Sequence, residues 1–197
     1  MTHYFTDNRS LPQNRKKMEF RIWGFRVYLI TDNGVFSKEK VDFGSELLLS
    51  TLTPSAMSGK VLDVGCGYGT IGLSIKVANP ELDVTMVDVN DRALELTQLG
   101  AEVNGVTVNA FKSHCYENVT GTFQHIITNP PIRAGKDVVY SIFEGAHEHL
   151  DTDGALWVVI RKQQGAPSAI KKLEEIFGNC TVINKDKGYF ILKCIKK

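Results

Sequence analysis

Two stretches of the sequence combine residue types and spacings that can perform chemistry. Residues 61–72 contain four apolar-rich positions, three alternate glycines (Gly65, Gly67 and Gly69) and then an apolar run at helical spacing. Glycine permits a tight turn with close approach of backbone to a ligand, so this stretch predicts a buried strand, a binding turn and a helix. The second stretch is Asn129 followed by two prolines, where a rigid backbone can fix hydrogen-bond acceptors.

The glycine turn favours a positively charged ligand. The stretch also fits the dinucleotide fingerprint G-x-G-x-x-G, and Asp88 lies about twenty residues further on. In that fingerprint the first glycine directly follows the strand, so that a pyrophosphate sits on the helix N-terminus, whereas here the strand is expected to end at Val64. Asp63 adds a carboxylate that would repel a phosphate and attract an ammonium group. The expected ligand carries positive charge beside a ribose, as S-adenosylmethionine does.

Four segments carry a resemblance to a known family. Residues 63–69 resemble motif I of class I S-adenosylmethionine-dependent methyltransferases, and residues 129–132 resemble their amino-methylating motif IV. With residues 32–37 and 42–45 added, the chain is similar to the small-subunit ribosomal RNA guanine-N2 methyltransferases of the C type, over roughly residues 3–195. The resemblance implies S-adenosylmethionine as cofactor, RNA (ribosomal RNA or the small ribosomal subunit) as partner, and methylation of the exocyclic N2 amine of a guanine.

Cofactor roles follow for residues at the ends of the predicted strands. Asp88 is expected to accept from the ribose hydroxyls and Val89 to pack on the adenine. Related enzymes usually have an Asp at the position of His114, so His114, Ser113 or a backbone carbonyl must replace it as the adenine partner. The candidate cofactor-binding residues are Asp63, Gly65, Cys66, Gly67, Gly69, Asp88, Val89, Ser113, His114 and Asn129, with Phe36 and Gly44 as further candidates.

The Asn-Pro-Pro-Ile segment supplies the candidate catalytic residues. The Asn129 side-chain oxygen and the Pro130 carbonyl can hold both protons of an exocyclic amine and turn its lone pair toward the methyl group, and Pro131 fixes that carbonyl. Ile132 offers an apolar surface to a base, and Arg133 could donate to a guanine carbonyl or to a phosphate. Alternatives are a plain strand-terminating turn, methylation of another planar amine (adenine, cytosine, protein glutamine or a small molecule), or a cofactor- or RNA-binding module without turnover.

Composition narrows the class of protein. The chain has 197 residues, a length that suits one domain, and its four cysteines form no C-x-x-C pair, so neither a zinc site nor a disulfide framework is expected. There is no run of eighteen apolar residues and no signal-peptide layout at the amino terminus. We therefore expect a cytoplasmic protein with no membrane segment and no metal, either a monomer or a homodimer.

The net charge of +1 conceals an asymmetry. Residues 1–26 carry +4 and residues 185–197 carry +4, so the 158 residues between them carry −7. Basic ends on an acidic body predict an edge that faces a polyanion, although solvated strand faces and a frayed tail would give the same pattern.

The periodicity predicts the elements that must position these residues. Residues 18–22 and 27–31 alternate as two strands of a hairpin, closed by a turn at 32–34. This hairpin covers the cofactor site, touches substrate or only seals a sheet edge. We expect residues 1–34 to be this extension packed on a methyltransferase domain of residues 35–197. The expected strands of that domain are 61–64, 83–88, 106–111, 124–128, 155–161, 180–185 and 188–195, and the expected helices are 44–53, 70–78, 90–103, 136–150 and 167–177.

This alternation indicates an α/β fold, a doubly wound, seven-stranded, mostly parallel sheet with helices on both faces. The last two strands are separated by two residues, too few for a crossover, so one strand must run antiparallel. That arrangement resembles class I methyltransferases and departs from the dinucleotide fold.

Overall fold

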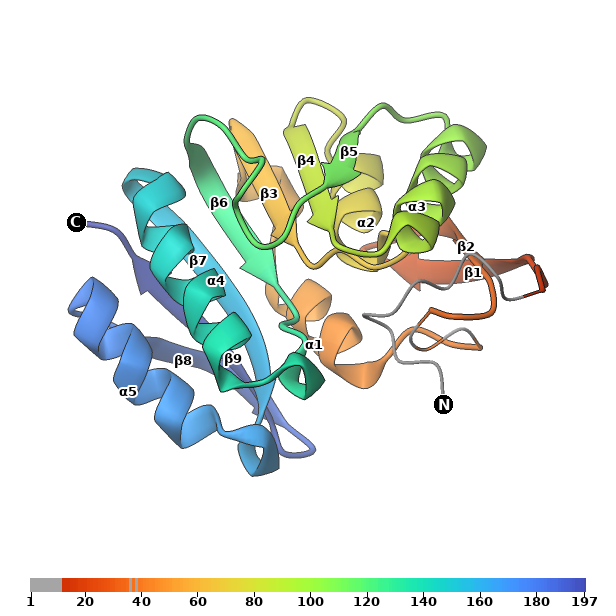
Figure 1. Ribbon diagram of the computed structural model, residues 1–197. Helices are drawn as coiled ribbons and strands as arrows, with labels where there is room; N and C mark the ends of the chain where they lie inside the picture. The colour runs from red at the N-terminus through yellow and green to blue at the C-terminus, as the bar shows by residue number, and fades with distance from the viewer. Residues whose placement is uncertain (1–11, 36, 38) are drawn as a thin grey trace.

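The computed structural model describes residues 12–35, 37 and 39–197 (Figure 1). Its main sheet consists of β3 (Lys60–Val64), β4 (Asp83–Asp88), β5 (Asn109–Lys112), β6 (Phe123–Thr128), β7 (Leu150–Arg161), β8 (Thr181–Asp186) and β9 (Tyr189–Ile195). The α-helices are α1 (Phe43–Thr51), α2 (Thr70–Ala78), α3 (Asp91–Asn104), α4 (Lys136–His149) and α5 (Ala166–Phe177). Short 3-10 turns are η1 (Pro54–Ala56), η2 (Ile132–Ala134) and η3 (Lys162–Gln164).

The strand order of the main sheet is β5-β4-β3-β6-β7-β9-β8. Strands β3 to β7 pair in parallel, and β9 pairs antiparallel with both β7 and β8. The expected doubly wound sheet with one antiparallel strand is therefore confirmed. The chain moves outward from β3 through β4 to β5 and then returns to the other side of β3 as β6, so the order reverses between β3 and β6. Ligands of such sheets bind beyond the carboxyl ends of the strands at this reversal.

Two apolar cores hold the sheet between its helices. Consecutive residues of β3 point to opposite faces, so Val61 packs in the core beneath α1, α2 and α3, while Leu62 packs in the core beneath α4 and α5. Both side chains are fully buried. A strand that is buried on both faces must be apolar along most of its length, which makes the charged Asp63 in its midst conspicuous.

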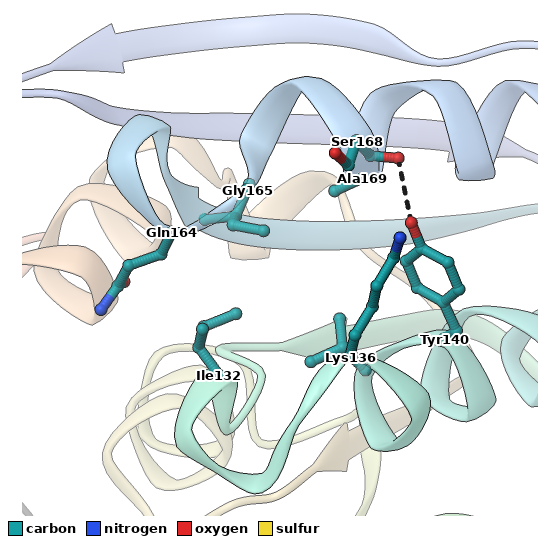
Figure 2. A pocket seen from close by; sticks show the side chains of 9 residues that line it. Ile132, Lys136, Tyr140, Gln164, Gly165, Ser168 and Ala169 are labelled. Carbon is teal, nitrogen blue, oxygen red and sulfur yellow. Dashed lines mark hydrogen bonds between the residues drawn. The ribbon is translucent and has the colours of Figure 1, made fainter.

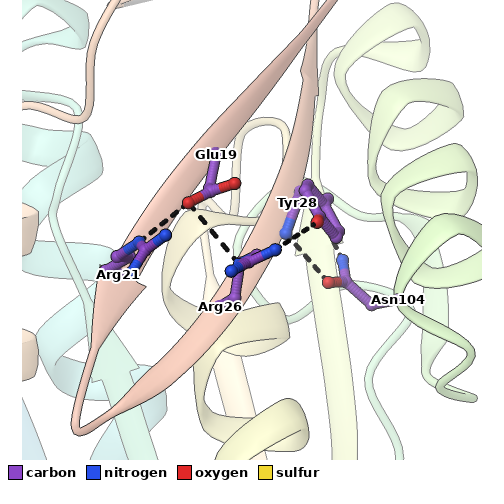
Figure 3. A network of polar contacts seen from close by, with 5 residues as sticks. All are labelled: Glu19, Arg21, Arg26, Tyr28 and Asn104. Carbon is purple, nitrogen blue, oxygen red and sulfur yellow. Dashed lines mark hydrogen bonds and ion pairs between the residues drawn. The ribbon is translucent and has the colours of Figure 1, made fainter.

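The amino-terminal hairpin is formed by β1 (Lys16–Ile22) and β2 (Phe25–Thr31). It is a separate two-stranded sheet whose second strand packs on α2 and α3. The Asn104 side chain mimics a neighbouring strand, because it accepts from the Tyr28 N–H at 2.8 Å and donates to the Tyr28 carbonyl at 2.6 Å (Figure 3). Of the alternatives for the hairpin, pairing with an edge of the main sheet is therefore excluded, because β1 and β2 form their own sheet.

Some boundaries differ from those expected. The predicted strand at 106–111 begins only at Asn109, because Gly105 ends α3 in a left-handed conformation and the Val106 N–H closes the helix onto the Ala101 carbonyl. The predicted helix at 44–53 ends at Thr51. Among the described residues, no helix has the length and apolar character needed to cross a membrane.

Candidate active site

The glycine turn follows β3 and is fastened to the end of β4. The N–H groups of Gly65 and Cys66 both donate to the Val87 carbonyl, at 2.9 and 3.0 Å. Gly65, Gly67 and Gly69 have φ angles of 73°, 58° and 97°, a region that favours glycine. The Gly65 backbone is exposed, and a Cβ added there would meet only Pro131, at 3.9 Å. The turn thus presents bare backbone toward the Asn-Pro-Pro segment.

Asp63 places a buried carboxylate under this turn. Its side chain is 1% exposed; Oδ2 accepts from the Gly72 N–H at 2.9 Å, whereas Oδ1 has no hydrogen-bond partner among the described residues. Burial raises the pKa of Asp63 to about 7, opposed by the Gly72 N–H and reinforced by the charge of Asp88. A ligand with a positive group would satisfy the orphaned oxygen, whereas a phosphate would add repulsion.

Asp88 ends β4 next to the turn. Its carboxylate is buried; Oδ2 accepts from the Gly67 N–H at 2.8 Å and Oδ1 from the Asn90 N–H at 2.9 Å. Asn90 in turn caps α3 by accepting from the Ala93 N–H. Val89, between the two, is half-buried. These contacts bring the predicted ribose carboxylate and the predicted adenine-packing residue to the rim of the glycine turn.

The candidates after β5 are placed differently from one another. Ser113 is buried, and its hydroxyl donates to the Cys115 carbonyl at 3.0 Å while accepting from the Asn118 N–H at 3.1 Å. The hydroxyl proton of Ser113 is therefore committed to its own loop. His114 has a side chain that is 55% exposed, with Nδ1 3.4 Å from a carboxylate oxygen of Glu117.

The Asn-Pro-Pro turn follows β6 and faces the glycine turn. The Thr128 hydroxyl donates to the Val64 carbonyl at 2.9 Å, which ties the ends of β6 and β3 together. The Ile132 N–H donates to the Pro130 carbonyl at 2.9 Å and so fixes its direction in addition to the proline ring that follows. A carbonyl oxygen has two lone pairs, so Pro130 retains the capacity to accept a second hydrogen bond.

The amide of Asn129 is oriented by two residues at the start of α1. Its nitrogen donates to Asp42 Oδ1 at 3.1 Å and to the Ser45 hydroxyl at 3.0 Å. A carboxylate only accepts, so the nitrogen of Asn129 must face Asp42 and its oxygen must face away. Asp42 is itself fixed, because the same oxygen caps α1 through the Ser45 N–H at 3.1 Å.

The segment before α1 also touches the glycine turn. The Tyr68 hydroxyl donates to the Ser37 carbonyl at 3.0 Å, and burial raises the pKa of Tyr68 to about 12, so this donor stays protonated at neutral pH. Gly44 is buried, and an added Cβ would lie 3.0 Å from the Tyr189 ring, which accounts for the small residue there. The candidate Phe36 lies outside the described residues.

Comparison with known proteins shows which family the chain belongs to. The sequence matches the family described as methyltransferase small domain over residues 26–193. The chain belongs to this family. Membership confirms the resemblance drawn from the motifs, and with it a methyltransferase that uses S-adenosylmethionine.

Three relatives show how far the similarity extends. An uncharacterised protein of Bacillus subtilis, YbxB, is 48% identical over 98% of both chains. Ribosomal RNA small subunit methyltransferase C of Vibrio parahaemolyticus is 38% identical over 80% of this chain and 46% of its own length. The solved structure of the T. thermophilus 16S rRNA N2 G1207 methyltransferase, in complex with AdoMet and guanosine, is 30% identical with a TM-score of 0.84, over 95% of this chain and 52% of that one. The chain spans about half the length of these curated methyltransferases.

The residues of this methyltransferase fit its cofactor. The turn offers a buried carboxylate with an orphaned oxygen, a second buried carboxylate at the end of β4, and an exposed glycine backbone facing the Asn-Pro-Pro turn. Among the residues that the structure describes, no group of three or more His, Cys, Asp or Glu is arranged to hold a metal ion.

Sequence reasoning missed the contribution of Asp42 and Ser45. Both belong to a segment that marked the family resemblance, but nothing in their spacing links them to Asn129, which lies more than eighty residues away. The one local signal was a helix cap at Asp42. Ile132 is half-buried in η2, whereas Arg133 beside it is exposed.

Proposed function

We propose that this methyltransferase transfers a methyl group from S-adenosylmethionine to the exocyclic N2 amine of a guanine in RNA, with small-subunit ribosomal RNA as the substrate class. The observation that carries the proposal is the fixed amide of Asn129. Because Asp42 and Ser45 hold its nitrogen, its oxygen faces away from them as an acceptor, and the carbonyl of the next residue, Pro130, supplies a second acceptor. Two neighbouring acceptors match the two protons of a primary amine.

The chain's residues act by orientation. An exocyclic amine donates its lone pair into the purine ring, which makes it a poor nucleophile. Asn129 Oδ1 and the Pro130 carbonyl would hold both amine protons and direct the lone pair out of the ring plane toward the glycine turn, an alignment worth several kcal/mol of the barrier. S-adenosylmethionine supplies an electrophilic methyl group when bound. The alkylated nitrogen is strongly acidic and loses its proton to water, so no basic side chain is needed within residues 129–132.

The cofactor roles follow from the contacts of the turn. We assign the ammonium group to Asp63 and the ribose hydroxyls to Asp88, with Val89 packing on the adenine. His114 is assigned to the rim of the adenine site, and a backbone group is the better partner for the adenine amine than Ser113, whose hydroxyl proton is already used. Gly44 contributes by allowing α1 to approach Tyr189.

Two observations support guanine in RNA as the methyl acceptor: the residue type at position 132 and the names of the relatives. Ile132 presents an aliphatic side chain where an aromatic ring would favour stacking on adenine or glutamine. The Vibrio parahaemolyticus relative is named as a ribosomal RNA small subunit methyltransferase, and the T. thermophilus structure is that of a 16S rRNA N2 G1207 methyltransferase with guanosine. This chain matches only about half the length of these proteins. The guanine target is therefore proposed for this chain and is not taken over from the relatives.

Cations and aromatic rings lie together near the start of α1. Lys187 is 4.5 Å from the centre of the Phe43 ring, and Arg161 is 5.5 Å from that of Tyr189, which itself contacts Phe43 at 5.5 Å between ring centres. Such cation and ring combinations suit RNA backbone and unstacked bases. The hairpin is a weaker candidate for RNA binding, because Glu19 pairs with Arg21 and Arg26 and so offsets part of their positive charge (Figure 3).

One labelling experiment tests the proposal. The protein is incubated with methyl-labelled S-adenosylmethionine and, separately, total RNA, free small ribosomal subunits and a protein extract, each from cells that lack the enzyme. RNA that takes up label is digested to nucleosides. We expect label in N2-methylguanosine. Label in methyladenosine, methylcytidine or protein would support another planar amine, and cofactor binding with no transfer to any fraction would support a module without turnover.

A further inference from the structure

A cavity of about 200 Å³ lies directly beside the Asn-Pro-Pro turn, between the starts of α4 and α5 (Figure 2). Ile132 of the turn points into it, toward Gly165 and Ala169 on the opposite side. Pockets for drug-sized ligands measure about 300–1,000 Å³, so this smaller cavity suits part of one planar ring system. Neither Asn129 nor Pro130 lines it, so it extends the site away from the predicted position of the amine.

The cavity has apolar walls and is also lined by four residues with polar side chains, Lys136, Tyr140, Gln164 and Ser168. Among the described residues that line it, Lys136 is the one with a charged side chain. Its ammonium lies 5.0 Å from the centre of the Tyr140 ring, and the Tyr140 hydroxyl proton is directed to the Ser168 carbonyl at 3.5 Å. An ammonium group donates three hydrogen bonds and accepts none. The Lys136 ammonium therefore favours a ligand edge that carries acceptors, and the Gln164 amide and the Ser168 hydroxyl can donate to such an edge as well.

We propose that this cavity receives the O6 and N7 edge of the target guanine and that Lys136 donates to it. That edge presents two acceptors in guanine, whereas adenine presents a donor at the position of O6. With the amine held by Asn129 and Pro130, the ring would lie on Ile132, the residue shared by the turn and the cavity. The inference rests on the proposed function and names Lys136 as the residue that selects the base. Lys136 and Arg133 are both exposed, but Lys136 lines the cavity and Arg133 does not, which leaves Arg133 for the phosphate backbone.

Base analogues isolate the contact. A synthetic RNA fragment spanning the guanine identified by labelling is made with guanosine, 2,6-diaminopurine riboside or 7-deazaguanosine at that position. All three keep the amine at C2, but the second replaces O6 by a donor and has no proton on N1, and the third lacks N7. We expect the unaltered enzyme to prefer guanosine over the diaminopurine by about tenfold or more in kcat/KM. Lys136→Met should remove most of this preference, and Lys136→Arg should retain part of it.

Matched controls separate the contact from general damage. Lys171→Met makes the same change at an exposed position of α5 outside the cavity and should keep the preference. Ser168→Phe, at an exposed position on the cavity rim, should lower kcat/KM for all three fragments while leaving cofactor affinity unchanged, and Lys171→Phe should do neither.

The outcomes distinguish the two proposals. An unaltered guanosine preference in Lys136→Met, or full activity of Ser168→Phe, would overturn the role of the cavity while leaving guanine methylation intact. Failure of the unaltered enzyme to methylate any RNA guanine would reject the proposed function, and this inference with it.

Discussion

The Asn129 side-chain nitrogen lies 3.1 Å from a carboxylate oxygen of Asp42, and that same oxygen caps helix α1. One atom thus serves two purposes, fixing the first turn of a helix and setting which end of an amide faces the reaction. The two purposes can be separated by substitution, because asparagine is as good a helix cap as aspartate but also offers a donor.

Asp42→Asn should lower kcat with little change in stability. The Asn129 amide could then adopt either orientation, and a loss of about tenfold to 100-fold is expected for misplaced acceptors. Asp42→Ala should show the same loss and also lower the free energy of unfolding by about 1 kcal/mol through the missing cap. Steady-state kinetics and urea unfolding check both. A wild-type kcat in Asp42→Asn would argue against the orienting role.

Asn129→Ala should nearly abolish turnover and leave cofactor affinity close to normal. The substitution removes one of two acceptors that hold the amine, and a loss of at least about 100-fold in kcat is expected. Methyl transfer and calorimetric binding of S-adenosylmethionine measure the two effects. Asn184→Ala is the matched control, because Asn184 lies on the edge strand β8 and its side chain donates to the Thr51 hydroxyl at the end of α1. Equal loss of binding and turnover would contradict the assigned role.

Asp63 should make the cofactor-free protein less stable as pH rises. Its pKa is about 7 when folded, against an ordinary value of 3.8, so between roughly pH 4 and 7 the unfolded chain releases a proton that the folded chain retains. The contribution of Asp63 to stability is therefore fully present below pH 4 and lost as pH rises through 7. Urea unfolding across this range should show the trend in the native sequence and lose it in Asp63→Asn.

Cofactor affinity should change with pH in the opposite direction. Pairing with a positive group requires the ionised form of Asp63, so the affinity for S-adenosylmethionine should rise by up to about tenfold per pH unit below 7 and then level off. Calorimetry in buffers of different ionisation enthalpy would reveal the proton that Asp63 releases when S-adenosylmethionine binds below pH 7. Asp63→Asn should bind more weakly and without this slope; an unchanged slope would assign the proton to another group.

Gly44→Ala should destabilise the protein by about 1–3 kcal/mol through overpacking against Tyr189. Combining it with Tyr189→Ala should cost less than the sum of the two single changes, because the new methyl group then meets only Asp42 Oδ1, at 3.2 Å, and no longer the ring. Urea unfolding of the four proteins gives the coupling. Additive costs would exclude Tyr189 as the cause of the requirement for glycine.

Local signals sufficed for much of the fold. The strand at 61–64, the glycine turn and the helix at 70–78 were predictable from local sequence alone. An apolar run predicts the buried strand, the alternate glycines predict the positive φ angles, and the apolar spacing predicts the helix. The strand expected from 106 failed because Val106 and Val108 alternate like a strand while they finish the turn after α3.

Contacts over long sequence distances were beyond prediction. No pattern linked Asp42 to Asn129, Tyr68 to Ser37, or the hairpin to Asn104, since each pairing depends on where whole elements pack. The commitment of the Ser113 hydroxyl to its own loop is another example: the sequence identified the position but not the partner.

The reversal of strand order between β3 and β6 also has an evolutionary consequence. The carboxylates assigned to the methyl donor lie on β3 and β4, whereas the residues assigned to the methyl acceptor follow β6, and the start of α1 orients Asn129. Mutations on the acceptor side can explore new targets while the donor side remains intact. A change of target in such an enzyme therefore requires neither a new fold nor a new cofactor, only changes in the segments that hold the acceptor.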